Sequence, residues 1–451
     1  MSERLAALAA TLPLERLPLH LEPDPRRVLL RPFLPTLVVK PTGSPGHVER
    51  LECLMQRLSA LDASTCDLEL ERLRQRFGVR HRTLERLAQQ RWQDVLAPLQ
   101  PQHPLSAEQQ LLLGYYLTHE YSLESAALFN PSLVPHPVQG GLAPGSLRVV
   151  LSLRATGEGH ISSIEFRSGV ISADGQMQLD AVSPFVFQGE ITSLHGSDDH
   201  YQVSYDPESL LSERVLFPVT ARESNGLEDA RFVRLEGGEP RYLATATAYD
   251  GQGIHSQLIE TADFRRFELR PLQGSAIRNK GLAFFPRRVN GAWLMLGRQD
   301  SENIHLMSSD QPDCWHDSQV LLRPQEPWEF IQLGNCGSPL ETEAGWLVLT
   351  HGVGPVREYC IGAALLDLHD PSRVIGRLRQ PLLRAADDER DGYVPNVVYS
   401  CGGLIHADHL WLPYAVSDRS TKLARVALAP LLELLQHSPP RAEVVSAVGV
   451  G

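Results

Sequence analysis

The stretch Gly345-Trp346-Leu347-Val348-Leu349-Thr350 is typical of the chain after Pro131, where short runs of β-branched, aromatic and aliphatic residues alternate with turns rich in Gly, Asp, Asn and Pro. Four other runs resemble it: 148–153, 241–246, 292–296 and 409–414. Each follows a turn and another strand, and the spacing between runs is mostly roughly 50 to 90 residues, the scale of a propeller blade with its loops. The pattern predicts five similar β units.

Two architectures fit this pattern. Five units imply the five blades of a β-propeller, which is mainly β and carries its loops at the two ends of the blades. A large β-sandwich would show the same density of turns. Periodicity therefore leaves both architectures open.

The N-terminal part has a different texture. From about Gly46 to Asn130 glycine is scarce and leucines recur at helical spacing, as in Leu51, Leu54 and Leu58. Ser106 is a helix N-cap candidate, and a short helix is expected over 429–436 near the end of the chain. We therefore expect a helical region over residues 1–124, a β domain over 125–436 and a flexible tail over 437–451.

Composition excludes several classes of protein. The 451 residues are 42% hydrophobic and 21% charged, as expected for a globular protein, and the net charge of −12 argues against a surface that wraps nucleic acid. The six cysteines lie far apart without a C-x-x-C pair, which indicates reduced thiols and a cytoplasmic location. The N-terminus lacks the features of a signal peptide, and no apolar stretch is long enough to span a membrane.

The segment from Gly226 to Val233 carries the strongest candidate for chemistry. Glu228, Asp229 and Arg231 lie at the mouth of a strand. Adjacent carboxyls tend to raise each other's pKa, which suits a general acid, whereas a nearby arginine has the opposite effect. An acidic turn with a structural salt bridge is the alternative.

Three cationic or titratable residues follow at strand ends. Asn279 and Lys280 precede an apolar strand, and Arg298 follows the next one, so the two cations can converge on one anion or can simply be solvated. His351 leaves a buried strand, a position that usually holds a structural histidine. His406 and His409 form an H-x-x-H without surrounding acids or thiols, so we expect no metal site.

Several short motifs follow one another in a fixed order: Phe129-Asn130-Pro131, Arg154 at the end of a strand, Gly226 to Phe232, Asn279-Lys280 to Phe285-Pro286, Trp328-Glu329, Gly337-Ser338-Pro339, Gly345 to Val353, Val394 to Gly402, and Tyr414 to Asp418. Each motif alone is weak. The ordered set, over about residues 125–430, resembles glycoside hydrolase family 130, the inverting mannoside phosphorylases and related mannosidases.

The resemblance implies both a fold and a site. It implies a five-bladed β-propeller, with Asp229 as the proton donor, whose proton reaches the glycosidic oxygen through a hydroxyl of the bound mannosyl unit. The phosphate-binding residues that it implies are Lys280, Arg298 and His351. The expected substrate-binding residues are Arg154, Glu228, Arg231, Asn279, Asn396 and Asp418.

The leading hypothesis is therefore an inverting phosphorylase that cleaves a β-mannoside with inorganic phosphate as co-substrate and needs no other cofactor. The retained cations favour this reaction, because phosphate needs positive charge to hold it whereas an inverting hydrolase needs a second carboxylate. An inverting β-mannosidase, with Glu228, Glu302 or Glu341 as its base, is the second hypothesis. A non-catalytic sugar-binding propeller is the third. The N-terminal helices are candidates for self-association, and no nucleic-acid or membrane partner is expected.

Overall fold

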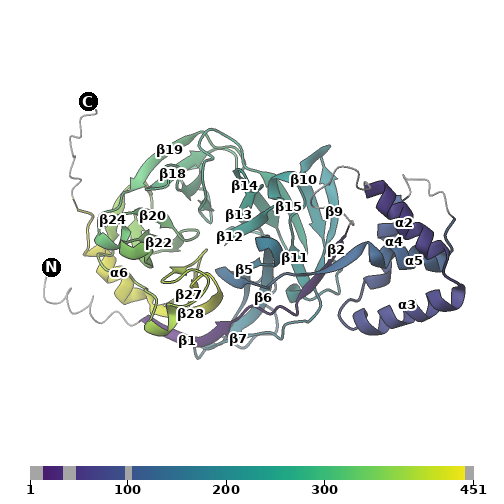
Figure 1. Cartoon of the computed structure of the whole chain (residues 1–451). Coiled ribbons are helices and arrows are strands. Elements are labelled where there is room, and N and C mark those ends of the chain that lie inside the picture. Colours follow the sequence, from purple (N-terminus) through teal and green to yellow (C-terminus); the bar gives the residue numbers. More distant parts are fainter. Residues whose placement is uncertain (1–13, 34–46, 97–103, 442–451) are drawn as a thin grey trace. The chain divides into compact units, whose positions relative to one another are not determined.

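The computed structural model describes residues 14–33, 47–96 and 104–441 (Figure 1). The first thirteen residues, and residues 442–451 of the expected tail, lie outside this range. The chain divides into two compact units. One comprises the described parts of 1–24, 124–182 and 188–451, and the other comprises those of 25–123 with 183–187.

Five antiparallel meanders make up most of the first unit, which confirms that the protein is mainly β (Figure 1). The first three are β4 (Ala127–Pro135), β5 (Leu147–Thr156), β6 (Ser162–Ile171) and β7 (Met177–Leu179); β12 (Gly226–Arg234), β13 (Tyr242–Tyr249), β14 (Ile254–Thr261) and β15 (Arg266–Pro271); and β16 (Ala283–Phe284), β17 (Trp293–Gly297), β18 (Ile304–Ser309) and β19 (Asp317–Leu322).

The last two meanders have interrupted first strands. In the fourth, β20 (Gln332–Asn335) and β21 (Leu340–Thr342) both pair with β22 (Gly345–Val353), which β23 (Tyr359–Leu366) and β24 (Val374–Arg377) follow. In the fifth, β25 (Val398–Tyr399) and β26 (Leu404–His406) pair with β27 (His409–Val416), then β28 (Ser420–Ala427) and β1 (Leu14–Leu21). The five runs predicted as strands are β5, β13, β17, β22 and β27, the second strand of each meander. That prediction is confirmed.

The outer strand of the fifth meander comes from the other end of the chain. β1 pairs antiparallel with β28 from Leu14↔Val426 to Leu21↔Thr421. An insertion between the first two meanders holds β8 (Phe187–Gln188), β9 (Glu190–Leu194), β10 (Ser197–Ser204) and β11 (Arg214–Leu216). Within it, β10 extends the second meander by pairing with β15. A parallel bridge between Gly226 and Ser162 links the first two meanders into one sheet.

Apolar clusters fill the spaces between successive meanders. Trp346 and Leu366 of the fourth meander pack with Leu296 of the third, and Leu412 of the fifth packs with Leu349 of the fourth. Similar clusters join the second meander to the third and the fifth to the first. Phe166 of the first meander stacks on Phe267 of the second, with ring centroids 5.4 Å apart. Each meander therefore buries its faces against two neighbours.

The second unit is mainly helical. It contains α2 (His47–Ser59), α3 (Ala63–Phe77), α4 (Leu84–Leu96) and α5 (Ala107–Tyr116), together with the two-stranded sheet of β2 (Val28–Pro32) and β3 (Thr118–Ser122). Ser106 caps α5 as predicted, and it forms a capping box with Gln109. The expected helical pattern up to Asn130 is wrong at its end, because residues 118–122 pair with 28–32 as strands.

The sequence's other structural predictions concern the C-terminal helix and the cysteines. The predicted C-terminal helix is α6 (Leu428–Gln436). All six cysteines are free thiols. Within the described ranges, no helix has both the length and the apolar character needed to cross a membrane.

Candidate active site

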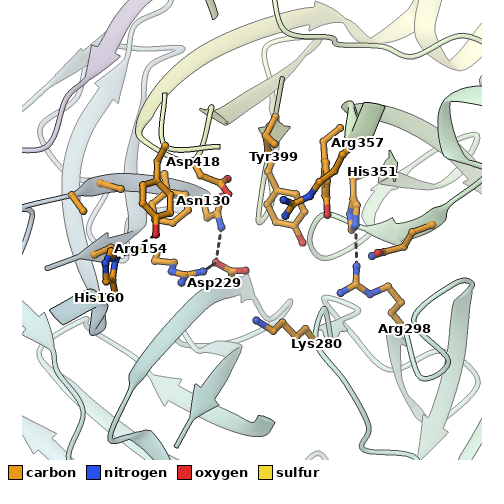
Figure 2. Close-up of a pocket in the computed structure, with 18 residues that line it drawn as sticks. Asn130, Arg154, His160, Asp229, Lys280, Arg298, His351, Arg357, Tyr399 and Asp418 are labelled. Carbon is orange, nitrogen blue, oxygen red and sulfur yellow. Dashed lines mark hydrogen bonds and ion pairs between the residues drawn. The ribbon is translucent and has the colours of Figure 1, made fainter. Parts of the chain in front are cut away.

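A pocket of about 350 Å³ lies at one end of the first strands of the meanders (Figure 2). We call these first strands, β4, β12, β16, β20 and β25, the leading strands. The start of each leading strand, or the loop before it, contributes to the wall, as do four of the turns that join second and third strands. Residues far apart in sequence therefore converge because the meanders repeat the same geometry.

Two matching β-bulges place the central carboxylate. Pairing shifts between Glu228 and Arg231 in β12 and between Phe129 and Ser132 in β4. Each bulge holds a residue of positive φ, Asp229 at 54° and Asn130 at 48°. Such backbone strain in a residue other than glycine is concentrated at functional sites. The bulges aim both side chains at one point, where Asn130 Nδ2 donates to Asp229 Oδ1 at 2.7 Å (Figure 2).

This carboxylate is one of four charged side chains that form a continuous ion-pair network. Lys280 Nζ lies 2.9 Å from Glu228 Oε2, and Arg154 NH2 lies 2.8 Å from Glu228 Oε1. Arg154 NH1 is 3.4 Å from Asp229 Oδ1. Glu228 therefore connects two cations, one of which also contacts Asp229. We refer to these four residues as the Lys280–Asp229 network.

The two carboxylates that line the pocket have different electrostatic surroundings. Burial alone would raise the pKa of Asp229, but Arg154, Arg231 and Lys280 outweigh it and hold that pKa below its usual value. Burial, followed by the charge of Asp229, raises the pKa of Asp418 to about 6. The environments thus separate an ionised carboxylate from one that titrates near neutrality.

The opposite wall carries Arg298 and His351. Arg298 NH1 lies 3.2 Å from His351 Nε2, and because a guanidinium can only donate, the imidazole accepts through Nε2 and is neutral. Burial, followed by Arg298 and Arg231, holds the pKa of His351 well below its ordinary value. Gly334 makes room for this ring, since a Cβ there would come 2.3 Å from Cε1 of His351. His351 therefore orients Arg298 rather than adding a positive charge.

A third arginine reaches the pocket from a strained turn. Val356 and Arg357, between β22 and β23, both have φ of 58°. Val356 is 91% exposed, so burial of its side chain does not explain why the turn adopts this strained conformation. Arg357 lines the pocket (Figure 2), and its charge opposes the rise in the pKa of Asp418. The turn thus adds a cation to the pocket that acts on Asp418.

Two aromatic rings form a rim at the pocket. His160 belongs to the β5–β6 turn and has φ of 60°, and Tyr393 lies in the loop before β25. Their ring centroids are 6.0 Å apart, and Tyr393 is 61% exposed. Both rings line the pocket, and their arrangement suits contact with the apolar face of a sugar.

Six of the ten predicted site residues line this pocket: Asp229, Asp418, Arg154, Lys280, Arg298 and His351. Glu228 lies beside them in the Lys280–Asp229 network. Arg231 does not line the pocket and is 1% exposed. It donates to the backbone oxygens of Cys336 and Asp229 and to the Tyr399 hydroxyl, and so ties three leading strands together.

The two predicted asparagines form hydrogen bonds with the backbone and with neighbouring side chains. Asn279 Oδ1 accepts from the backbone N–H of Lys280 at 2.8 Å, and its amide donates to Ser301. Asn396 Oδ1 accepts from Arg390 at 2.8 Å, and its backbone oxygen accepts from the N–H of Tyr359. Neither asparagine lines the pocket.

Several lining residues were missed by the sequence prediction: Asn130, His160, Gln332, Arg357, Tyr359, Tyr393 and Tyr399. Asn130 was within a recognised motif without a role. In the described part of the chain, no three His, Cys, Asp or Glu side chains are grouped so as to hold a metal ion.

Comparison with known proteins identifies related sequences. The family model described as beta-1,4-mannooligosaccharide phosphorylase, of glycoside hydrolase family 130, matches residues 161–437. A 1,2-beta-oligomannan phosphorylase of Thermoanaerobacter sp. is 33% identical over 243 residues, which is 52% of this chain and 79% of that protein. A beta-1,2-mannobiose phosphorylase of Listeria innocua is 33% identical over 49% of this chain and 63% of its own length.

One solved structure supports the likeness of fold. It comes from work on glycoside hydrolases of the GH130 family of mannoside phosphorylases that target beta-1,2 mannosidic linkages in Candida mannan. It superposes with a TM-score of 0.50 at 18% identity, over 68% of this chain and 86% of its own.

Proposed function

Because the chain belongs to glycoside hydrolase family 130, we propose that it is an inverting phosphorylase that cleaves a β-mannoside with inorganic phosphate and releases α-mannose 1-phosphate. One observation carries this proposal. Arg298 lies on the wall opposite Arg154, with Lys280 between them, and the carboxylates Asp229 and Asp418 lie away from Arg298 (Figure 2). Each charge-assisted hydrogen bond from such cations to phosphate is worth about 1.5 to 3 kcal/mol.

In the proposed reaction, a phosphate oxygen attacks the anomeric carbon from the face opposite the departing oxygen. The new carbon–oxygen bond forms as the glycosidic bond breaks, which converts the β-mannoside to the α-phosphate. Asp229 supplies a proton to the departing oxygen through a hydroxyl of the mannosyl unit. Monohydrogen phosphate loses its own proton on becoming the ester, so Asp229 can be reprotonated and no net proton is consumed.

The remaining residues divide between two ligands. We propose that Arg154 and Asp418 hold the mannosyl unit next to Asp229, and that Arg298, oriented by neutral His351, holds phosphate together with Lys280. His160 and Tyr393 would then face the departing sugar. Two relatives with β-1,2 substrates in their names make β-1,2-linked mannosides the first substrates to test.

The geometry disfavours hydrolysis with a carboxylate base. Glu302 is exposed in the β17–β18 turn. Glu341 accepts two hydrogen bonds from Arg287, at 2.7 and 2.6 Å, and lines a different cavity at the other end of the leading strands. Glu228 is engaged by both Arg154 and Lys280. Neither Glu302 nor Glu341 lines the pocket, and Glu228 is held in two ion pairs, so none of the three is placed to deprotonate a water there.

We also propose that the meanders form a five-bladed β-propeller, with β1 completing the fifth blade. The pairing of β1 with β28 and the apolar contacts between successive meanders support this architecture. In this architecture the catalytic domain is the predicted 125–436 region together with β1. The cytoplasmic location and the self-association of the helical unit stay predictions.

Incubation with β-1,2- and β-1,4-mannobiose, with and without phosphate, tests the proposal. We expect α-mannose 1-phosphate, detected by ³¹P NMR, to form only when phosphate is present, and to form with the wild type but not with Asp229→Asn. Free mannose at equal rates in both conditions would establish the hydrolase instead. Binding of mannobiose by both wild type and Asp229→Asn, without turnover by either, would establish a sugar-binding protein.

A further inference from the structure

Asp229 must carry a proton before it can supply one, yet its surroundings favour the ionised form. Several charged or titratable groups surround it. Glu228 and Arg231 lie on its own strand, and the groups from other elements are Arg154, Lys280, Asp418, His351, Tyr399 and Cys401. Among the cations, Arg154 makes the direct ion pair and Lys280 acts from the phosphate side. A proposed phosphorylase therefore needs a way to protonate Asp229 when its second substrate arrives.

Glu228 is placed to provide that link. It is 7% exposed, and its two carboxylate oxygens are divided between Lys280, at 2.9 Å, and Arg154, at 2.8 Å. The contact from Arg154 to Asp229 is longer, at 3.4 Å. Arg154 therefore divides its guanidinium between two carboxylates and binds Glu228 more closely.

We propose that Glu228 is a positioning residue that couples phosphate binding to protonation of Asp229. When a phosphate dianion engages Lys280, the lysine holds Glu228 less strongly, and Glu228 interacts more fully with Arg154. Arg154 then stabilises ionised Asp229 less, and the dianion itself repels that carboxylate. Both effects favour a proton on Asp229, so Asp229 is protonated when phosphate is bound.

This inference rests on the proposed function, because it requires phosphate at Lys280. It assigns Glu228 a role different from direct contact with the sugar, since Glu228 does not line the pocket. It also distinguishes Glu228 from the base of a hydrolase, which would have to receive a proton from water rather than remain in two ion pairs.

Steady-state kinetics of Glu228→Gln provide the first test. Loss of the carboxylate frees Lys280 for phosphate and leaves Arg154 to pair with Asp229 alone. We expect the KM for phosphate to fall about threefold while kcat falls about tenfold, with the alkaline limb of the kcat profile moving to lower pH. Glu228→Asp keeps the charge and should keep the alkaline limb close to that of wild type. Glu260→Gln, on β14 and ion-paired with Arg241 and Arg270, is the matched control.

Proton uptake on anion binding provides the second test, with sulfate as a dianion that does not titrate near neutrality. Calorimetry at pH 6.5 in two buffers of different ionisation enthalpy counts the protons taken up. We expect uptake by wild type, less by Glu228→Gln, and less by Asp229→Asn than by wild type. Asp418→Asn measures the share taken up by the other pocket carboxylate.

The outcomes separate the two proposals. Absence of phosphate-dependent cleavage by wild type would overturn the proposed function. The coupling would be overturned if Glu228→Gln kept its phosphorolysis with an unchanged pH profile. It would also be overturned if the KM for phosphate rose while kcat fell. Equal proton uptake by wild type and Glu228→Gln would overturn it as well, even if the kinetics were affected.

Discussion

Asn130 and Asp229 occupy equivalent bulges in two leading strands, and the amide Nδ2 of Asn130 donates to Oδ1 of Asp229 at 2.7 Å. Neither bulge depends on glycine, although both residues have positive φ. The strain at each position is worth of order 1 to 3 kcal/mol, so the surrounding strands must hold it in place. The pair thus fixes the orientation of the carboxylate before any substrate binds.

Asn130→Ala should lower kcat/KM for phosphorolysis about tenfold to a hundredfold, because the carboxyl group of Asp229 is no longer held in its orientation. The hydrogen bond from Asn130 favours the ionised carboxylate, so its loss raises the pKa of Asp229. The alkaline limb of the pH profile should therefore move to higher pH. Unchanged kcat/KM in a variant with wild-type thermal stability would show that Asn130 does not position the acid.

The sequence predicted the second strands of the meanders well and the leading strands poorly. β5 and β22 are long apolar runs, so their pattern is visible in any window of the chain. The leading strands β16 and β25 have only two residues each, and β4 and β12 are interrupted by bulges. The pairing of β1 could not be predicted from the sequence, because its partner strand, β28, lies at the other end of the chain.

The sequence could not show which predicted residues line the pocket at places where the alternation of a strand is interrupted. In a regular strand Asp229 and Arg231 would share a face, but the bulge between them separates the two, and Arg231 is buried beneath the pocket. Arg357 and Tyr393 lie in turns whose sequence carries no periodic signal. Only the tertiary structure brings them to the pocket, so they could not be found from spacing.

His351 should control phosphate affinity without titrating in the working range. His351→Phe removes the acceptor of Arg298 while keeping a ring beside Tyr399, whose centroid lies 4.8 Å away. We expect the KM for phosphate to rise about tenfold, with little change in the KM for mannoside. Gly334→Ala should act in the same direction, because its Cβ would displace the imidazole.

The pH dependence of phosphate affinity tests whether His351 is neutral. Its pKa is held well below the ordinary value, so the imidazole stays neutral above pH 6.5 and gains its proton only in more acidic solution. His351 should therefore add no inflection to phosphate affinity between pH 6.5 and 8, so the pH dependence of affinity in His351→Phe should follow that of wild type over this range. A histidine-dependent inflection near pH 7 that disappears in His351→Phe would contradict this assignment.

Tyr393→Ala should weaken binding of the acceptor sugar specifically. In the reverse reaction, from α-mannose 1-phosphate and a mannose acceptor, we expect the KM for the acceptor to rise about tenfold, since an aromatic contact is worth about 0.5 to 1.5 kcal/mol beyond its buried area. The KM for α-mannose 1-phosphate should stay near that of wild type. Equal effects on both constants would place Tyr393 outside the acceptor site.

Asp418→Asn should stabilise the protein at neutral pH while lowering activity. The pKa of Asp418 is raised to about 6, so its contribution to stability is present in acid and is lost as pH rises through that value. Removing the charge should increase the free energy of unfolding on the order of 2 kcal/mol at pH 7.5 and hardly at all at pH 4. Urea unfolding at both pH values measures this difference, with the exposed Asp310→Asn as control. If Asp418→Asn gave the same change at both pH values, the cause would lie in packing rather than in the buried charge.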